Sequence, residues 1–184
     1  MSEYTKKIED VFRLKDSTDI KELEIIICFA KIFKCKQFLE IGTYTGSFSI
    51  SMTKVFGNEI NIDTVDIPPN KYTPKILPEE RAKAIPNIKF HRCGSDEFFR
   101  INEKKYDFVF IDGNHTNKQS AKDIQNAIEC LSPNGIMFIH DVRKTKQRHK
   151  DVMRSFRNFN NENYIKFIIK TSRGLGVILP LKKL

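Results

Sequence analysis

The chain lacks the marks of secreted, disulfide-stabilised and membrane-spanning proteins. Its four cysteines show no CxxC spacing, and no apolar signal segment follows the polar start MSEYTKKIED. No apolar run reaches the roughly 20 residues that a membrane-spanning helix needs. We therefore expect a reduced, cytoplasmic chain without a membrane partner.

The motifs of several nucleotide-binding enzymes are also missing. The glycine loop at residues 42–46 has neither the GxGxxG of a dinucleotide-binding loop nor the Gly-Lys end of a phosphate-binding loop. None of the five tyrosines stands four residues before a lysine, which argues against a short-chain nicotinamide reductase. The ligand of this loop must therefore be identified from other residues.

Length and charge set broad limits on the protein. A chain of 184 residues, 40% of them hydrophobic, is long enough for one domain with a real core and short for two, so we expect a single domain over 1–184. Lysine and arginine number 32 against 23 acidic residues, a net charge of +9 that favours anionic partners. Because the excess is spread along the chain, charge alone indicates little about function.

Hydrophobic spacing alternates between the periods of strands and helices. Short apolar runs predict strands at 36–41, 60–66, 87–93, 106–112, 135–141, 164–170 and 175–181. Helical spacing fills the intervals, at 20–30, 48–56, 95–101, 121–131 and, after a basic loop, before 156. This order predicts an α/β fold with a doubly wound, mostly parallel seven-stranded sheet, helices on both faces and an antiparallel C-terminal edge hairpin.

The sequence also predicts the structure of three further segments. Residues 67–86 hold five of the seven prolines and should form a loop over the site. Residues 1–20 should form an N-terminal lid or helix. Pro133-Asn134-Gly135 predicts a turn before the fifth strand.

Three predicted strands end on a carboxylate, at Asp66, Asp112 and Asp141. Ligands of such sheets bind beyond the carboxyl ends of the strands, so these side chains point to a binding site. A solvated strand end, which spares a carboxylate the cost of burial, is the alternative interpretation. Asp66 follows Gly42 by 24 residues, a spacing that suits a carboxylate accepting the ribose hydroxyls of an adenosine.

The segments EIGTYTG, CGSDEFF, YDFVFIDGNH and LSPNGIMFIHDV, together with Asp66, resemble class I S-adenosylmethionine-dependent methyltransferases over about residues 17–180. Within that superfamily the chain is most similar to small O-methyltransferases of the catechol and caffeoyl-CoA type and to sugar and macrolide-sugar O-methyltransferases. The resemblance implies a Rossmann-like methyltransferase fold with S-adenosylmethionine as cofactor.

The resemblance also assigns site residues. In those relatives the glycine loop wraps the methionine part of the cofactor, the acid matching Asp66 binds ribose, and the segment matching 94–96 borders adenine. The implied cofactor site consists of Glu40, Gly42, Thr43, Tyr44, Gly46, Ser47, Asp66, Gly94, Ser95, Asp96 and Asp112. Phe48 replaces a serine that contacts the cofactor carboxylate in the catechol type, although Ser47 and Ser49 flank it.

A divalent metal, with magnesium expected, is implied at Asp112 and Asp141. Such an ion would orient the acceptor hydroxyl and stabilise its alkoxide. Val142 stands where the catechol type has an asparagine ligand, so Glu40, water or the substrate would have to complete the site.

His115 and Asp112 are the candidate catalytic residues. Histidine, with an unperturbed pKa of about 6.5, suits a general base at neutral pH, and sugar O-methyltransferases have a histidine at the position of His115. A helix-start histidine held by local hydrogen bonds is the alternative for His115. For His140 we favour a satisfied structural role.

The function favoured by these features is O-methylation of a small hydroxylated molecule such as a sugar, a sugar nucleotide or a secondary metabolite. The basic run Arg143, Lys144, Lys146, Arg148 and Lys150 either meets an anionic group of that substrate or is a solvated face. The alternatives are an RNA methyltransferase or binder and a non-catalytic S-adenosylmethionine-binding scaffold. A nucleic-acid partner is not expected, because base amino-methyltransferases carry a Pro-Pro-aromatic motif where DGNH stands. A homodimer that completes the pocket fits the short loops, although no residue specifies one.

Overall fold

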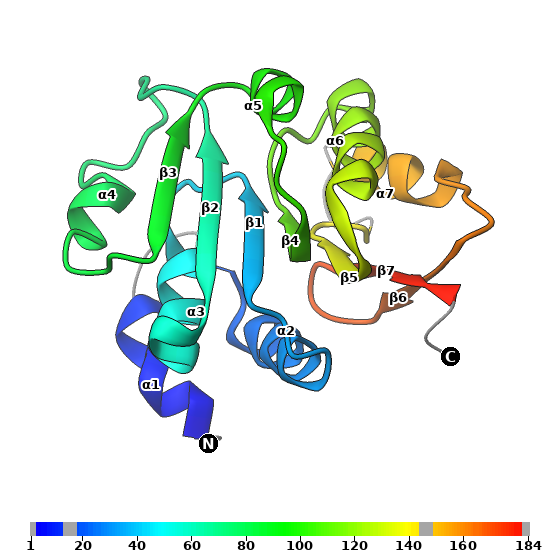
Figure 1. Ribbon diagram of the computed structural model, residues 1–184. Coiled ribbons are helices and arrows are strands. Elements are labelled where there is room, and N and C mark those ends of the chain that lie inside the picture. Colours follow the sequence, from blue (N-terminus) through cyan, green and yellow to red (C-terminus); the bar gives the residue numbers. More distant parts are fainter. Residues whose placement is uncertain (1–2, 13–17, 144–148, 182–184) are drawn as a thin grey trace.

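A computed structural model describes residues 3–12, 18–143 and 149–181 (Figure 1). Its helices are α1 (Glu3–Phe12), α2 (Ile20–Ile32), α3 (Ser47–Phe56), the short 3₁₀ turn η1 (Gly57–Glu59), α4 (Pro78–Arg81), α5 (Ser95–Ile101), α6 (Asn117–Cys130) and α7 (His149–Asn158). Its strands are β1 (Gln37–Ile41), β2 (Asn61–Asp66), β3 (Ile88–Arg92), β4 (Tyr106–Ile111), β5 (Leu131–Ile139), β6 (Tyr164–Ile169) and β7 (Leu175–Pro180).

All seven strands form one sheet in the order β3-β2-β1-β4-β5-β7-β6. Strands β1 to β5 run parallel to one another, whereas β7 is antiparallel to both β5 and β6. The predicted fold, with its antiparallel C-terminal hairpin, is therefore confirmed. The strand order reverses between β1 and β4, and ligands of doubly wound sheets bind beyond the strand ends at that point.

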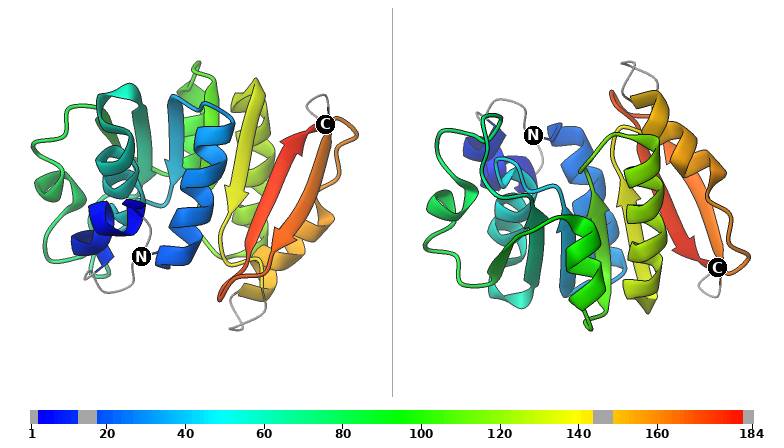
Figure 2. Two further views of the ribbon diagram at one scale, coloured as in Figure 1. Left: turned by 90° about the horizontal axis from the view of Figure 1, so that it is seen from below. Right: turned by 90° about the horizontal axis from the view of Figure 1, so that it is seen from above.

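Alternating strand residues build a separate core on each face of the sheet, because successive side chains of a strand point to opposite faces. Phe38 of β1 packs with Leu23 of α2 and Phe48 of α3, and Ile8 of α1 belongs to the same cluster. Leu39, the next residue of β1, packs with residues of α5, α6 and α7. Figure 2 shows helices on both faces of the sheet.

The turn predicted at Pro133-Asn134-Gly135 is wrong, because these residues lie inside β5. They occupy an irregularity in the pairing of β4 with β5, where the register shifts between Tyr106 and Phe108. A Cβ on Gly135 would lie 2.7 Å from the carbonyl oxygen of Tyr106, so the chain has no room for a side chain there. A bulge thus takes the place of a free turn.

The two segments expected to border the site differ in position. Ile67 and Tyr72, from the proline-rich segment 67–86, line the main cavity, and this segment also contains the short α4. Residues 1–20 contribute α1, which packs on α3 near the starts of β1 and β2, opposite the edge where those strands end (Figure 1). No residue of α1 lines the cavity, so the expected N-terminal lid does not lie over the site in the part of the chain that is described.

None of the described helices is long and apolar enough to cross a membrane.

Candidate active site

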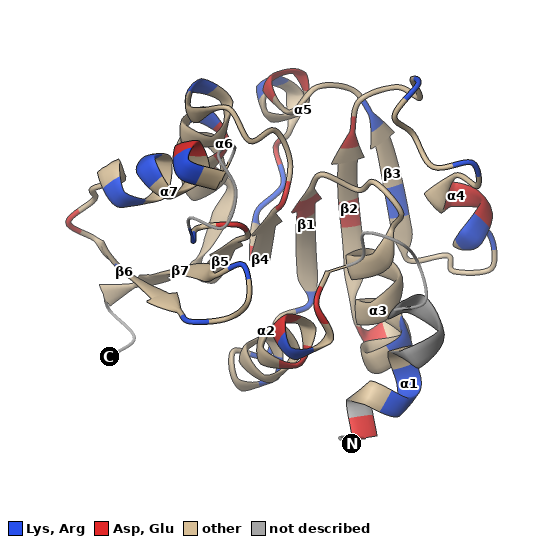
Figure 3. Ribbon diagram, turned by 180° about the vertical axis from the view of Figure 1, so that it is seen from behind, with Lys and Arg blue, Asp and Glu red and all other residues tan. Residues whose placement is uncertain are grey.

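A cavity of about 810 Å³ lies at the carboxyl ends of the parallel strands. Nine of the residues predicted for the site line it, namely Gly42, Tyr44, Asp66, Gly94, Ser95, Asp96, Asp112, His115 and Asp141. The other four, Glu40, Thr43, Gly46 and Ser47, do not line it. Acidic residues mark the carboxyl ends of β1 and β2 (Figure 3). The volume suits a cofactor together with a small substrate.

The glycine loop is held close to the neighbouring strand end. Gly42 has a φ of +100°, and a Cβ on it would lie 2.2 Å from the carbonyl oxygen of Asp112. Gly46 has a φ of +75°, and a Cβ there would lie 2.9 Å from the Cβ of Pro78. Both positions therefore require glycine, for backbone conformation and for space. The loop is wedged between the end of β4 and the proline-rich segment.

Asp66 fixes the loop from the neighbouring strand. Its Oδ2 accepts a hydrogen bond from the backbone N–H of Tyr44 at 2.7 Å, and its Oδ1 accepts one from the N–H of Ile67 at 2.8 Å. The end of β1 and the end of β2 are thereby joined at the point where the predicted ribose acid stands. Asp66 lines the cavity, so its carboxylate can also accept hydrogen bonds from a ligand.

The predicted adenine segment belongs to a polar network that includes two residues the sequence interpretation missed. Gln119 of α6 donates from Nε2 to Asp96 at 2.9 Å and to Asp123 at 3.0 Å, and Ser95 donates to Asp123 at 2.7 Å. Burial raises the pKa of Asp123, with a further contribution from the charge of Asp96. Gln119 and Asp123 stand four residues apart on α6, which could have indicated a shared helix face.

Glu40 lies behind the glycine loop in a fully buried position. Its carboxylate accepts hydrogen bonds from Ser49 and, at 2.6 Å, from Thr64. Burial raises the pKa of Glu40 from 4.5 to about 8, and the negative charges of Asp112 and Asp66 add to that effect. The role predicted for Glu40 in cofactor or metal binding is not supported by a place in the cavity wall.

The raised pKa of Glu40 predicts a pH-dependent stability. Between pH 4.5 and 8 the folded chain keeps a proton on Glu40 that the unfolded chain releases, so stability should decrease as the pH rises. The slope from this one group is about 1.4 kcal/mol per pH unit. Glu40→Gln should remove this slope of stability against pH. Glu129→Gln, at an exposed site on α6, should leave the slope unchanged. Urea denaturation at several pH values between 5 and 8 measures the difference, and parallel curves for wild type and Glu40→Gln would contradict the assignment.

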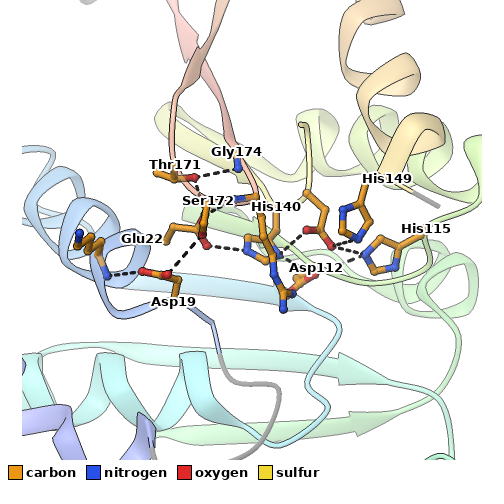
Figure 4. Close-up of polar contacts among 12 residues, drawn as sticks. Asp19, Glu22, Asp112, His115, His140, His149, Thr171, Ser172 and Gly174 are labelled. Atoms are coloured by element: carbon orange, nitrogen blue, oxygen red, sulfur yellow. Dashed lines mark hydrogen bonds and ion pairs between the residues drawn. The ribbon is translucent and has the colours of Figure 1, made fainter. Parts of the chain in front are cut away.

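Two carboxylates and three histidines meet at the ends of β4 and β5 (Figure 4). Asp141 Oδ2 lies 2.7 Å from His115 Nε2 and 3.2 Å from His149 Nε2. His140 Nδ1 lies 3.2 Å from Asp112 Oδ1 and 3.8 Å from Asp141 Oδ1. Backbone pairing brings the strand ends together, because the N–H of Asp112 bonds to Ile41 O and the N–H of His140 bonds to Ile111 O.

Asp141 is held in an unusual conformation. Its φ is +60°, and its side chain is only 2% exposed. Burial by itself would raise the pKa of Asp141, but the hydrogen bond from His115 and the charges of His140 and His149 hold it below its usual range. A strained, buried and ionised aspartate is typical of a functional site.

His140 spans two acidic groups in the interior. Its Nε2 lies 2.7 Å from Glu22 Oε2, which agrees with the structural role favoured by the sequence interpretation, but its Nδ1 has no hydrogen bond and faces the cluster. Burial lowers the pKa of His140, yet the charge of Asp112, together with Glu22 and Asp141, raises it well above the usual value. His140 therefore belongs to the candidate site as well as to the core.

His149 was missed in the sequence interpretation, where it stood inside the basic run. It begins α7, is fully buried and stacks on His115 with ring centroids 5.6 Å apart. Three cations of the basic run, Lys144, Lys146 and Arg148, lie outside the described residues. Arg173, from the β6–β7 connection, lines the cavity and supplies a cation there that was not predicted.

The donor atoms at the end of β5 fit a divalent metal ion. Asp112, His140 and Asp141 each offer one atom within 4.8 Å of the others, and His115, Asp141 and His149 form a second such set. Asp141 Oδ1 and His140 Nδ1 are buried and have no hydrogen bond, so both atoms are available to an ion. Carboxylate oxygens are ligands that hard divalent ions prefer.

Comparisons with known proteins identify the family of the chain and its fold. A family model described as a methyltransferase domain matches residues 39–142, which include every residue predicted for the site but neither Glu22 nor His149. No curated protein matches the chain by sequence. The match confirms the resemblance to methyltransferases on which the sequence interpretation rested.

Solved structures share the fold at low sequence identity. The O-methyltransferase from Bacillus cereus in complex with S-adenosylhomocysteine is 14% identical, has a TM-score of 0.77 and pairs 95% of this chain with 90% of that one. The S-adenosylhomocysteine-bound methyltransferase PaMTH1 from Podospora anserina is 16% identical, with a TM-score of 0.77 and coverages of 98% and 88%. TomG from Streptomyces achromogenes, an O-methyltransferase solved with S-adenosylmethionine, is 15% identical, with a TM-score of 0.74 and coverages of 98% and 90%.

Proposed function

The chain belongs to the methyltransferase-domain family, and on that premise we propose that it transfers a methyl group from S-adenosylmethionine to a hydroxyl of a small molecule. It is therefore an enzyme, a methyltransferase. The observation that carries the proposal is one cavity in which the glycine loop and Asp66 face the cluster of Asp112, His115 and Asp141. A cofactor site and a group able to take a proton thus share one space.

The cavity offers polar contacts for the ribose and the adenine of the cofactor. Gly42 permits close approach of the backbone, and Asp66 presents a carboxylate suited to ribose hydroxyls. Ser95, Asp96 and Gln119 supply polar atoms at the far end for an adenine. Bound S-adenosylmethionine would supply the methyl group on its sulfonium. The residues of the chain have to position the acceptor and accept its proton.

His115 is the residue best placed to accept that proton. In the tautomer that donates from Nε2 to ionised Asp141, the lone pair of His115 lies on Nδ1. Asp141 then orients the imidazole and stabilises its cationic form, as a carboxylate does for a histidine base in acyl transfer. Because His115 also lines the cavity, its ring is accessible to an acceptor hydroxyl.

A divalent ion held by Asp112 and Asp141 is part of the proposal, with magnesium as the ion expected from the sequence. When bound, it would lower the pKa of the acceptor hydroxyl and orient it. This pairing of carboxylates with a histidine base supports oxygen rather than nitrogen as the methylated atom. Arg173 in the cavity wall supports an acceptor that carries an anionic group, such as a sugar phosphate or a carboxylate.

Asp66→Ala tests the cofactor assignment. The substitution should weaken S-adenosylhomocysteine binding by about 1–3 kcal/mol, the usual cost of losing hydrogen bonds to a charged group. Isothermal titration calorimetry of the folded variant measures the effect. Asp151→Asn, on α7 and outside the cavity wall, is the matched control. Unchanged affinity in Asp66→Ala, or a preference for NAD over S-adenosylhomocysteine in the wild type, would overturn the assignment.

A further inference from the structure

His140, one of the candidate metal ligands, contacts a second carboxylate on the side of its ring that faces away from Asp112 and Asp141. Glu22 is fully buried on α2, and its Oε2 lies 2.7 Å from His140 Nε2. The other oxygen, Oε1, accepts hydrogen bonds from the Thr171 hydroxyl and from the backbone N–H of Arg173 at 3.4 Å. Because both of its oxygens have hydrogen-bond partners, the carboxylate of Glu22 is fixed in position. It therefore holds the ring of His140 in one orientation (Figure 4).

This hydrogen bond decides which nitrogen of His140 faces Asp112 and Asp141. Glu22 Oε1 accepts two hydrogen bonds, and Oε2 lies 2.7 Å from His140 Nε2, where a carboxylate oxygen serves as the acceptor of the ring N–H. His140 Nε2 must then carry the hydrogen, which leaves Nδ1 as the atom that faces Asp112 and Asp141. Nδ1 and Asp141 Oδ1 are both buried without a hydrogen bond. Both therefore point into one space between the carboxylates, where a proton on Nδ1, or a metal ion that replaces this proton, supplies the positive charge.

The charges of the cluster favour a cation in that space. Glu22, Asp112 and Asp141 surround His140, and the side chains of Glu22, His140 and Asp141 are at most 2% exposed. Buried carboxylates at this density need a compensating positive charge. A histidine that donates one ring N–H to a carboxylate and turns the other nitrogen inward is the usual arrangement of a metal-ligating histidine.

We propose that His140 Nδ1 joins Asp112 and Asp141 as a ligand, with Glu22 as the outer partner that orients it, and that the site selects a first-row transition-metal ion such as cobalt, nickel or zinc over magnesium. This inference rests on the metal site of the proposed function and concerns the identity of its ion. Imidazole nitrogen suits these ions, whereas magnesium binds oxygen ligands and keeps much of its water. Val142, where the catechol type has an asparagine, is fully buried in an apolar cluster, so the added ligand precedes Asp141 instead of following it.

Metal titration of the chain tests the proposal without an acceptor. After treatment with chelator, cobalt should bind and produce visible absorption bands that zinc abolishes. Magnesium should compete at least about 100-fold more weakly than zinc, because the imidazole ligand disfavours it. Equal competition by magnesium in the wild type would overturn the proposal, and this measurement needs no variant to fold.

Two variants locate the ligand and its support. His140→Ala should lower the cobalt affinity and change the absorption spectrum, and Glu22→Gln should lower the affinity by about 10- to 100-fold, the usual cost of losing an outer partner. His91→Ala is the matched control, because His91 pairs with Asp63 on β2 and lies outside the cavity wall. Wild-type cobalt affinity in folded His140→Ala would exclude the nitrogen ligand.

Cofactor binding in the same preparations separates the two proposals. If S-adenosylhomocysteine binds while cobalt does not, the metal inference is wrong and the methyltransferase assignment stands. If cobalt binds through His140 while S-adenosylhomocysteine does not bind, the proposed function is wrong and the metal site remains.

Discussion

Asp141→Asn should lower methyl transfer by about 10³- to 10⁴-fold, because one side chain serves two purposes. Its Oδ2 accepts the hydrogen bond from His115, and its Oδ1 faces Asp112 without a hydrogen bond of its own. Asparagine keeps the shape but loses the negative charge, so it neither stabilises a cationic His115 nor attracts a metal ion. Single-turnover transfer of a labelled methyl group to protocatechuate, a probe with both hydroxyl and carboxylate groups, measures the loss.

The cofactor should distinguish this effect from misfolding. S-adenosylhomocysteine affinity should change little in Asp141→Asn, since the glycine loop and Asp66 do not depend on the lost charge. Asp151→Asn, on α7, should keep the wild-type rate. If Asp141→Asn retained most of its activity, Asp141 would have no part in the reaction, and the strained conformation at φ +60° would need another explanation.

His115→Ala should reduce the rate by about 10²- to 10⁴-fold, the usual contribution of a positioned general base. In the wild type the rate should fall as the pH is lowered, because a protonated imidazole cannot accept the proton of the acceptor hydroxyl. The same pH dependence should be lost in His115→Ala. Added imidazole should restore part of the rate, since the cavity then has room for a free ring.

The metal offers a specific alternative to that result. A small effect of His115→Ala combined with complete loss of activity in chelator would transfer the deprotonating role from His115 to the ion. His91→Ala serves as control here too, because it removes an imidazole that pairs with Asp63 away from the cavity. An unchanged rate and an unchanged pH profile in His115→Ala would leave His115 as a merely structural partner of Asp141.

Most of the fold could be predicted because the hydrophobic pattern is local and strong. Phe38 and Leu39, or Met137 and Phe138, alternate between the two cores as neighbouring strand residues must. The exception is at residues 133–135, where local turn chemistry indicated a break. The pairing of β5 with β4 continues across it through a bulge, and only the neighbouring strand could reveal that.

The candidate site likewise contains residues that could be predicted from the sequence and residues that could not. Gly42, Asp66, Asp112 and Asp141 could be placed from sequence, because strand ends and the glycine loop are set by nearby residues. His149 and Glu22 could not, since α7 and α2 approach the cluster through packing of distant segments. The ring orientation of His140 depends on Glu22, 118 residues earlier in the chain, and no local pattern encodes it.

The amino-acid sequence by itself determined the order of strands and helices, the acidic strand ends and the resemblance to methyltransferases. These follow from side-chain periodicity and from motifs that are contiguous in the chain. Only the tertiary structure decided which groups share the cavity, which atom of His140 faces Asp112, and that burial raises the pKa of Glu40 to about 8. Ionisation and ligation depend on burial and on partners a few ångströms away, and chain folding brings these partners from distant parts of the sequence.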